Sequence, residues 1–245
     1  MGFKIKLVDG KLFKNAFEAI SLIVDEAQIV VDNDGVRCSA LDRSHITFCN
    51  LELQKDLFDE FQCDAPEKLN IDTMELMNVL KRMKSNDVLE LSVDEGNLVF
   101  VFEGDAIRKF RIRLIDIVYE APEPPNISVP CEIEIPSNLI KDAVNDVALY
   151  SDKLSFIINE NYFMVNSNDD FGDVEVKYLH GEENIHETVK SNYGIDKIKS
   201  ILKSSKFSPY VKLGLGNDMP LLFNFVLPTG DGSIGFMLAP RLEEE

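Results

Sequence analysis

The sequence predicts an α+β protein made of two similar domains, each built from antiparallel sheet and two helices. Three observations predict this fold class. Four pairs of short apolar runs flank turn residues, four stretches carry apolar side chains at helical spacing, and the order helix, hairpin, helix, hairpin occurs twice. Alternation at period two is typical of half-buried strands, whereas spacings of three and four residues are typical of amphipathic helices. The chain has 245 residues and 45% hydrophobic content, enough for a sizeable core in one or two domains.

Four β-hairpins are predicted from turn sequences that separate two strand-like runs. The turns are NDG, DEGN, NEN and GNDMP, and their asparagine, aspartate and glycine residues favour the backbone of tight turns. The strand pairs are 28–32 with 36–41, 88–93 with 98–102, 154–158 with 162–166, and 211–215 with 221–227. At the N-terminus, Phe3, Ile5 and Leu7 alternate with lysines, which indicates a further strand rather than a signal peptide.

Apolar spacing predicts four helices, over residues 10–24, 72–84, 137–149 and 194–206. In the first, Phe13, Phe17 and Ile20 fall on one stripe, and in the third Ile140, Val144 and Val147 do the same. Each predicted helix comes directly before one of the four hairpins. The protein is therefore mainly antiparallel sheet, with two helices in each half.

An internal repeat supports the division into two halves. LFKNAFEAI from Leu12 matches LIKDAVNDV from Leu139, 127 positions later, and VLKRMK from Val79 matches ILKSSK from Ile201, 122 positions later. The matches keep lysines as well as the apolar face. Between the halves, EAPEPPNISVP (120–130) has four prolines, which cannot donate to a strand ladder. We therefore expect a domain at 1–117, a connector at 118–130 and a second domain at 131–245.

The charge of the chain is distributed unevenly. It has 25 basic and 43 acidic residues, a net charge of -18, which as a whole opposes binding to a nucleic acid. The four predicted helices, however, hold ten basic and six acidic residues, so they carry +4 and the remainder carries -22. Lysines near helix C-termini complement the helix dipole, but Lys11 and Lys14 lie at a helix start, where the dipole disfavours a cation. A helical surface that faces a polyanion accounts for all ten.

The stretch ALDRSHI (40–46) contains the residue types of a catalytic triad, namely Asp42, Ser44 and His45. If the strand before it continues through this stretch, Asp42 and His45 lie about 10 Å apart, beyond hydrogen-bond reach. The sequence also has no G-x-S-x-G, no phosphate-binding glycine loop and no H-E-x-x-H. We expect no catalytic activity, and a hydrolase that uses these three residues is the alternative from another class.

No cofactor and no metal are expected. Four cysteines without a C-x-x-C pair and only three histidines give a zinc site little to build on, so reduced thiols in the interior are expected. No run of about 18 apolar residues occurs. These features predict a soluble intracellular protein.

Four features of the chain resemble one known family: GVRCSALDRSHITFCNLEL from Gly35, the proline-rich connector, the doubled pattern of helices and hairpins, and GFMLAPRLEEE from Gly235. Together they resemble the proliferating cell nuclear antigen family of DNA sliding clamps, and the archaeal members in particular. The resemblance covers the whole chain and implies a cytoplasmic protein, associated with the nucleoid in an archaeon, or a nuclear protein in a eukaryote. It implies a homotrimeric ring whose helices line a hole for duplex DNA. Such a ring binds DNA without sequence preference and tethers DNA polymerase for processive replication. One subunit of a heteromeric clamp is the alternative. The basic residues that would face DNA are Lys11, Lys14, Lys81, Arg82, Lys84, Lys141, Lys199, Lys203 and Lys206.

The resemblance also implies a groove for short peptide motifs of DNA polymerase, clamp loader, flap endonuclease and DNA ligase. Its residues in this chain are Leu41, His45, Ile46, Pro122, Pro124, Val129, Pro220, Met237, Ala239 and Pro240. Proline replaces the usual aliphatic residue at Pro122 and Pro124.

The subunit interface of the family joins two edge strands, which fall here on 107–115 and 171–179. The first contributes Arg108, Lys109, Phe110, Arg111 and Arg113, and the second contributes Asp173 and Glu175. Opposite charges on two edges favour pairing between chains.

Overall fold

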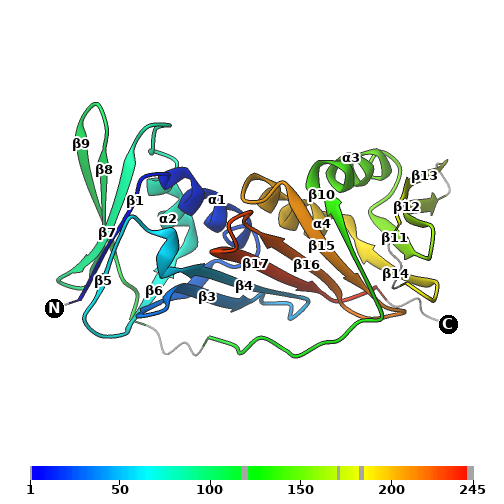
Figure 1. The fold of residues 1–245 in the computed structure, drawn as a ribbon, viewed down its shortest axis with the longest axis horizontal. Helices are drawn as coiled ribbons and strands as arrows, with labels where there is room; N and C mark the ends of the chain where they lie inside the picture. Colours follow the sequence, from blue (N-terminus) through cyan, green and yellow to red (C-terminus); the bar gives the residue numbers. More distant parts are fainter. Residues whose placement is uncertain (1, 117–120, 170–171, 182–184, 242–245) are drawn as a thin grey trace. The chain divides into compact units, whose positions relative to one another are not determined.

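The computed structural model describes residues 2–116, 121–169, 172–181 and 185–241. The chain forms two compact units (Figure 1). The first comprises Met1–Arg43, Cys49–Pro124 and Val226–Ile234, and the second comprises Ser44–Phe48, Pro125–Phe225 and Gly235–Glu245. The boundary expected at residues 117 and 118 lies outside the described residues.

The first half of the chain alternates strands with two helices. Its elements are β1 (Phe3–Leu7), α1 (Gly10–Ile20), β2 (Glu26–Asp32), β3 (Gly35–Leu41), β4 (Thr47–Gln54), the 3-10 helix η1 (Lys55–Leu57), β5 (Glu60–Cys63), β6 (Glu67–Asp72), α2 (Thr73–Leu80), β7 (Val88–Asp94), β8 (Asn97–Glu103) and β9 (Ile107–Arg113).

Among its described residues, the second half repeats that order without counterparts of η1 and β5, and it adds a 3-10 helix after its second α-helix. Its elements are β10 (Cys131–Pro136), α3 (Ser137–Val147), β11 (Lys153–Ile158), β12 (Tyr162–Asp169), β13 (Gly172–Leu179), β14 (Val189–Gly194), α4 (Ile195–Ile201), the 3-10 helix η2 (Leu202–Lys206), β15 (Tyr210–Leu215), β16 (Leu221–Val226) and β17 (Gly232–Leu238).

Strand pairing confirms the repeat. In the first half β1 pairs with β7 and β2 pairs with β6, and in the second half β10 pairs with β15 and β11 pairs with β14. The strand orders β1-β7-β8-β9 and β6-β2-β3-β4 thus recur as β10-β15-β16-β17 and β14-β11-β12-β13. All of the paired strands for which a register is known are antiparallel, and the four predicted hairpins are present.

Aromatic packing repeats with the topology. Phe102 lies 6.5 Å from Phe100 and 5.2 Å from Phe110, measured between ring centroids on β8 and β9. On β16 and β17, the Phe223–Phe225 and Phe225–Phe236 centroid distances are both 6.3 Å. Five of these six rings are at most 1% exposed, and the sixth, Phe110, is half-buried. The corresponding hairpins of the two units therefore supply equivalent aromatic residues to their cores.

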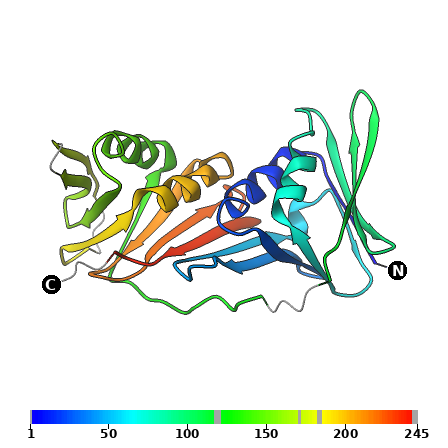
Figure 2. The ribbon, with the colours of Figure 1, turned by 180° about the vertical axis from the view of Figure 1, so that it is seen from behind.

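The helices of each unit lie together on one side of its strands. Figure 1 shows α1 beside α2 and α3 beside α4, and Figure 2 shows both pairs from behind. The helices bury the apolar stripe that the sequence predicts: Phe13, Phe17 and Ile20 in α1, and Val144 and Val147 in α3 are at most 1% exposed. Their other faces remain outside the core of the unit.

All four helices end earlier than predicted. The stretches 10–24, 72–84 and 137–149 contain α-helix only over Gly10–Ile20, Thr73–Leu80 and Ser137–Val147, and 194–206 changes to 3-10 geometry at Leu202. Ile23 and Met83 remain buried, but they lie in the turns that follow the helices. Their backbone N–H groups donate to the carbonyls of Ile20 and Leu80, three residues earlier. Periodic apolar residues report burial, and burial continues past the last helical bond.

Within the described residues, no helix is long and apolar enough to cross a membrane.

Candidate functional site

The basic residues of the first unit lie on the helix surface and in the turn after α2. Lys11 and Lys14, three residues apart, share the face of α1 opposite its buried stripe, and no acidic residue occurs in the first turn of that helix. Lys81 caps α2, and Arg82 and Lys84 follow in the turn rather than in the helix as predicted. All except the half-buried Lys14 are exposed.

The basic residues of the second unit follow α4. Lys199 and Lys203 are four residues apart on an exposed stripe that continues to Lys206 through η2. Lys141 is exposed on α3, next to Asp142. In the described parts of the chain, Lys11, Lys14, Lys141, Lys199 and Lys203 make no ion pair, so their charge is not neutralised locally.

The acids of α3 lie beside the β13 edge. Burial raises the pKa of Tyr178 on β13, and the negative charges of Asp142 and Asp146 raise it further. The Tyr178 hydroxyl donates to the Leu139 carbonyl of α3 at 2.8 Å. The sequence shows these acids as an exception among basic helices, and the structure associates them with the edge strand.

A buried carboxylate that sequence reasoning missed organises the turn after α2. Asp87 is 3% exposed and accepts the Lys84 backbone N–H at 2.5 Å. It also pairs with the Arg108 guanidinium, which donates to the Arg82 carbonyl at 2.8 Å. A Cβ added at Gly104 would lie 2.3 Å from Asp87 Oδ1. Asp87 therefore fixes the basic turn to strand β9, and Arg108 is held within its own chain.

The two predicted interface segments are edge strands of their sheets. β9 ends at Arg113, two residues earlier than predicted, and is last in the order β5-β1-β7-β8-β9. β13 begins at Gly172, and Phe171 lies outside the described residues. In the part of the chain that the structure describes, no backbone group outside β8 and β12 pairs with either strand. By contrast, the other edge strand of the sheet that contains β13, which is β14, has a partner: the Arg241 N–H donates to the Asn192 carbonyl.

Each edge strand has one face toward the helices and one toward solvent. On β9, Arg108, Phe110 and Ile112 are half-buried or buried, whereas Lys109, Arg111 and Arg113 are exposed. On β13, Val174, Val176 and Tyr178 are half-buried, whereas Asp173, Glu175 and Lys177 are exposed. Each solvent face carries most of its strand's charge, positive on β9 and mainly negative on β13.

The predicted groove residues fall in both units, and the second unit brings some of them together. The Ala239 N–H donates to the Ile46 carbonyl at 2.8 Å. Val129 lies against Gly214, where an added Cβ would meet its Cγ2 at 2.7 Å. Ile46 is 37% exposed. Pro220, Met237, Ala239 and Pro240 are half-buried, as are Leu41 and Pro122 in the first unit, while His45 and Pro124 are exposed. Residues 121–130 form no helix or strand, as predicted, and Glu120 lies outside the described residues.

The strand before the ALDRSHI stretch ends at Leu41, as predicted, and it does not continue through the stretch. β3 ends at Leu41 and β4 begins at Thr47, so Asp42, Ser44 and His45 belong to the turn between them. His45 has a φ of 58°, in the left-handed region that a turn can require. Asp42 is 3% exposed, whereas Ser44 and His45 are exposed. Strand alternation therefore cannot be used to judge a triad here.

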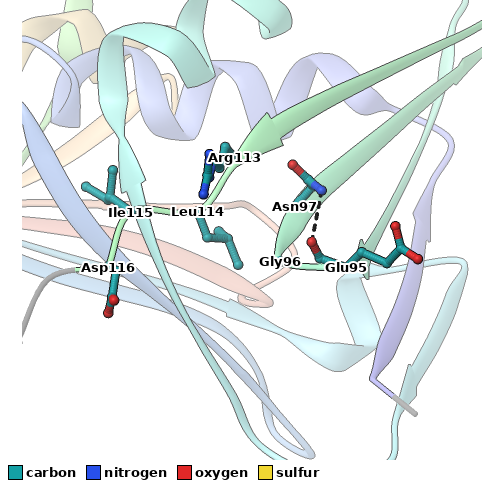
Figure 3. A pocket seen from close by; sticks show the side chains of 7 residues that line it. All are labelled: Glu95, Gly96, Asn97, Arg113, Leu114, Ile115 and Asp116. Atoms are coloured by element: carbon teal, nitrogen blue, oxygen red, sulfur yellow. Dashed lines mark hydrogen bonds between the residues drawn. The ribbon is translucent and has the colours of Figure 1, made fainter.

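A pocket in the first unit lies at the end of β9. Its volume is about 530 Å³, and Figure 3 shows its lining: Glu95, Gly96, Asn97, Arg113, Leu114, Ile115 and Asp116. Backbone bonds from Leu114 to Gly96 and from Ile115 to Asn70, both 3.0 Å, hold its walls. The carboxylates of Glu95 and Asp116 point to opposite sides in Figure 3, so they form no acid–base pair.

Tyr193 holds the loop that carries Pro220. Its buried hydroxyl donates to the Met219 carbonyl at 2.8 Å, and burial raises its pKa to about 12. An unfolded tyrosine titrates near pH 10. Between these values the folded chain keeps a proton that the unfolded chain loses, so this contribution to stability falls as pH rises.

We expect Tyr193→Phe to reduce the loss of stability between about pH 9.5 and 11.5. The measurement is urea unfolding of the variant and the wild type across this interval at one protein concentration. Parallel curves for the two proteins would contradict the assignment of the raised pKa to Tyr193.

Comparison with known proteins shows the family of the chain. Residues 2–121 match the family model described as proliferating cell nuclear antigen, N-terminal domain. A DNA polymerase sliding clamp of Methanobrevibacter smithii is 52% identical over 243 residues, 99% of each chain. The chain belongs to the DNA polymerase sliding clamp family. A second member, from Methanothermobacter thermautotrophicus, is 49% identical over 99% of each chain.

The fold of the family is shared as well. The crystal structure of the Entamoeba histolytica proliferating cellular nuclear antigen matches with a TM-score of 0.91 at 24% identity, covering 99% of this chain and 100% of that one. The predicted α+β clamp fold is confirmed.

Proposed function

We propose that three copies of this chain form a closed ring that slides on duplex DNA and tethers DNA polymerase for processive synthesis. The observation that carries the proposal is the position of charge. A chain with a net charge of -18 places exposed lysines without ion-pair partners, among the described residues, on its helices. Phosphates are the polyanion such a surface attracts, and a lysine ammonium reads no base sequence.

Contacts of this kind are weak and screened by salt, which suits sliding. Retention then depends on enclosure rather than affinity. The two edge strands supply the means of closing a ring, because β9 is basic, β13 is mainly acidic on its solvent face, and both leave backbone groups unpaired within the described residues.

Light scattering at micromolar concentration tests the assembly, and we expect the mass of about three chains of 27.7 kDa. After loading onto nicked circular DNA, the ring should stay bound, and linearising the DNA should release it. The mass of one chain would contradict the ring, and equal retention on circular and linear DNA would contradict enclosure.

A heteromeric clamp would use different chains for the two sides of each interface. This chain carries a basic and an acidic edge in one sequence, which favours self-assembly. Mixing the chain with related clamp chains from the same genome decides between the two, since a heteromeric subunit reaches a ring mass only in the mixture.

We propose that the second unit takes part in docking peptide motifs of polymerase, clamp loader, flap endonuclease and ligase. Ile46 supports this, because a large aliphatic side chain 37% exposed beside the half-buried Ala239 provides an apolar contact. We expect Ile46→Ser to weaken binding of a glutamine–aliphatic–aromatic–aromatic peptide roughly tenfold.

Fluorescence anisotropy with a labelled peptide measures this loss, and Val226→Ser, at a comparably exposed aliphatic side chain, is the matched control. Ring mass should be unchanged in both variants. Equal peptide affinity for the two variants would contradict the role of Ile46.

We infer that the chain has no catalytic activity of its own. Asp42 is buried and Ser44 is exposed in a turn, and family membership accounts for the chain without a hydrolase. Esterase or peptidase activity that disappears in Ser44→Ala would overturn this inference, whereas unchanged polymerase stimulation in that variant supports it.

A further inference from the structure

We propose that the pocket at the end of β9 is a second docking site for partner proteins, and that it takes an extended segment with apolar side chains next to a carboxylate. All of the residues that line this pocket belong to the first unit. The inference rests on the proposed docking of peptides by the second unit, because the repeat makes this pocket the counterpart of residues predicted for that groove.

The turn between β7 and β8 corresponds to the turn between β15 and β16. Glu95 and Asp218 each lie five residues before the first phenylalanine of the repeated aromatic cluster. Both have a left-handed backbone, with φ of 48° and 53°, which is uncommon for residues other than glycine. The two turns therefore match residue by residue.

The segment that leaves β9 corresponds to the segment that leaves β17. Ile115 and Arg241 each lie five residues after the last phenylalanine of the cluster. The Ile115 N–H donates to the Asn70 carbonyl at 3.0 Å, and the Arg241 N–H donates to the Asn192 carbonyl at 2.7 Å. These two asparagines are equivalent as well, because they face positions 28 and 155, which the repeat aligns.

Three residues that line the pocket therefore correspond to predicted groove residues. The equivalent pairs are Asn97 with Pro220, Arg113 with Ala239, and Leu114 with Pro240. Because the backbone is repeated, the first unit has an open depression at the place where the second unit has part of the predicted groove. The side chains differ between the two places, so the two sites should prefer different peptides.

The pocket is open at Gly96. A Cβ added there would have no atom within 4 Å, whereas the equivalent residue of the second unit, Met219, has a side chain that lies against Gly216. The Leu114 N–H donates to the Gly96 carbonyl at 3.0 Å, and the half-buried Leu114 side chain points toward Gly96 in Figure 3. An apolar side chain of a partner can therefore reach Leu114 without displacing a residue of this chain.

Arg113 determines which charge the site favours. Its side chain is exposed and makes no ion pair within the described residues, whereas the equivalent Ala239 has no charge. The carboxylates of Glu95 and Asp116 point to opposite sides of the pocket in Figure 3. A guanidinium with free donors binds a carboxylate through two parallel hydrogen bonds, so a partner segment with an acidic residue beside its apolar ones is favoured.

Peptide binding by the Ile46→Ser variant tests the second site, because this variant lacks the exposed aliphatic contact of the groove. The probes are three labelled peptides of equal length, in which leucine and phenylalanine are followed by two aspartates, two asparagines or two lysines. By fluorescence anisotropy at about 0.15 M salt, we expect the aspartate peptide to bind roughly fivefold more tightly than the asparagine peptide. This preference would act against the net charge of -18, which repels an acidic peptide.

Arg113→Gln, added to Ile46→Ser, should abolish the preference for aspartate and leave the affinity for the asparagine peptide within about twofold. A merely structural role of Arg113 would change the binding of all three peptides alike. Lys55→Gln in the same background is the matched control, since Lys55 is exposed on η1 in the first unit and its replacement removes the same charge. This control should keep the preference.

The outcomes separate this proposal from the earlier ones. If the Ile46→Ser variant binds none of the three peptides, or binds the lysine peptide most tightly, the second site is wrong as proposed. If Arg113→Gln keeps the preference for aspartate, the proposal is also overturned. The groove proposal fails separately, when Ile46→Ser binds the glutamine–aliphatic–aromatic–aromatic peptide as tightly as Val226→Ser does, and the Arg113 comparison still holds in that case. Because the pocket belongs to one unit, the comparison does not depend on ring formation.

Discussion

Asp87→Ala is expected to lower the free energy of unfolding by about 3 kcal/mol. The Asp87 side chain is 2% exposed, and its loss leaves the Arg108 guanidinium, 26% exposed, without its carboxylate. The Lys84 backbone N–H loses its 2.5 Å acceptor as well. Removing one partner of a largely buried ion pair costs more than the pair contributes, because the remaining charge stays desolvated.

Asp105→Ala is the matched control for Asp87→Ala. Asp105 also pairs with residue 84, through the Lys84 ammonium at 3.4 Å, but both side chains are more than half exposed. An exposed pair is worth little, so we expect a change below about 0.5 kcal/mol. Urea unfolding at one fixed protein concentration measures both variants, since assembly would make stability depend on concentration. Similar losses in the two variants would contradict the structural role of Asp87.

Gly104→Ala gives a second route to the same site. Its Cβ would lie 2.3 Å from Asp87 Oδ1, and this oxygen belongs to a carboxylate held by two donors. The carboxylate must move or the backbone must shift, so Gly104→Ala should also destabilise the turn after α2 although it removes no charge. Wild-type stability in this variant would show that the carboxylate can move at little cost.

The topology could be predicted from the sequence because its signals are local. Hairpins depend on a few turn residues, and helices on apolar spacing within one segment. The repeat then implied that the two halves share an arrangement, and the recurrence of the Phe100–Phe102–Phe110 cluster as Phe223–Phe225–Phe236 bears this out.

The ends of elements were less predictable, because burial and backbone bonding do not stop at the same residue. Ile23 and Met83 extend the apolar stripes of α1 and α2 but lie in turns, at 8% exposure each. At the end of β3, Asp42 is buried like a strand residue although the strand stops at Leu41. Sequence patterns report which side chains face the interior, and the backbone path between them depends on bonds that distant residues supply.

The role of Asp87 could not be predicted, because its partner is distant in the sequence. The stretch around it, Ser85–Asn86–Asp87, is typical of an exposed turn. Its burial depends on Arg108, 21 residues away on β9, and on the space left by Gly104. A basic residue on the inward face of a predicted edge strand was the available signal, since a charge at such a position needs a partner.

Replacing Lys11, Lys14, Lys199 and Lys203 together by alanine should reduce loading onto primed circular DNA roughly tenfold at about 0.15 M salt. These lysines make no ion pair within the described residues, unlike Lys84, which pairs with Asp105. In the proposed ring of three copies, each substitution is repeated in every copy. Fewer phosphate contacts should also make loading less sensitive to salt, because the slope of log binding against log salt depends on the number of contacts.

The control for position is a second quadruple variant with the same change in net charge. Lys55, Lys68, Lys153 and Lys190 are exposed on η1, β6, β11 and β14, away from the helices. Their replacement by alanine removes as much positive charge, so a general electrostatic effect on DNA binding would weaken both variants equally. We expect loading by this control to stay within about twofold of the wild type and its salt dependence to be unchanged. Equal defects in the two variants would mean that net charge, and not the helix surface, governs contact with DNA.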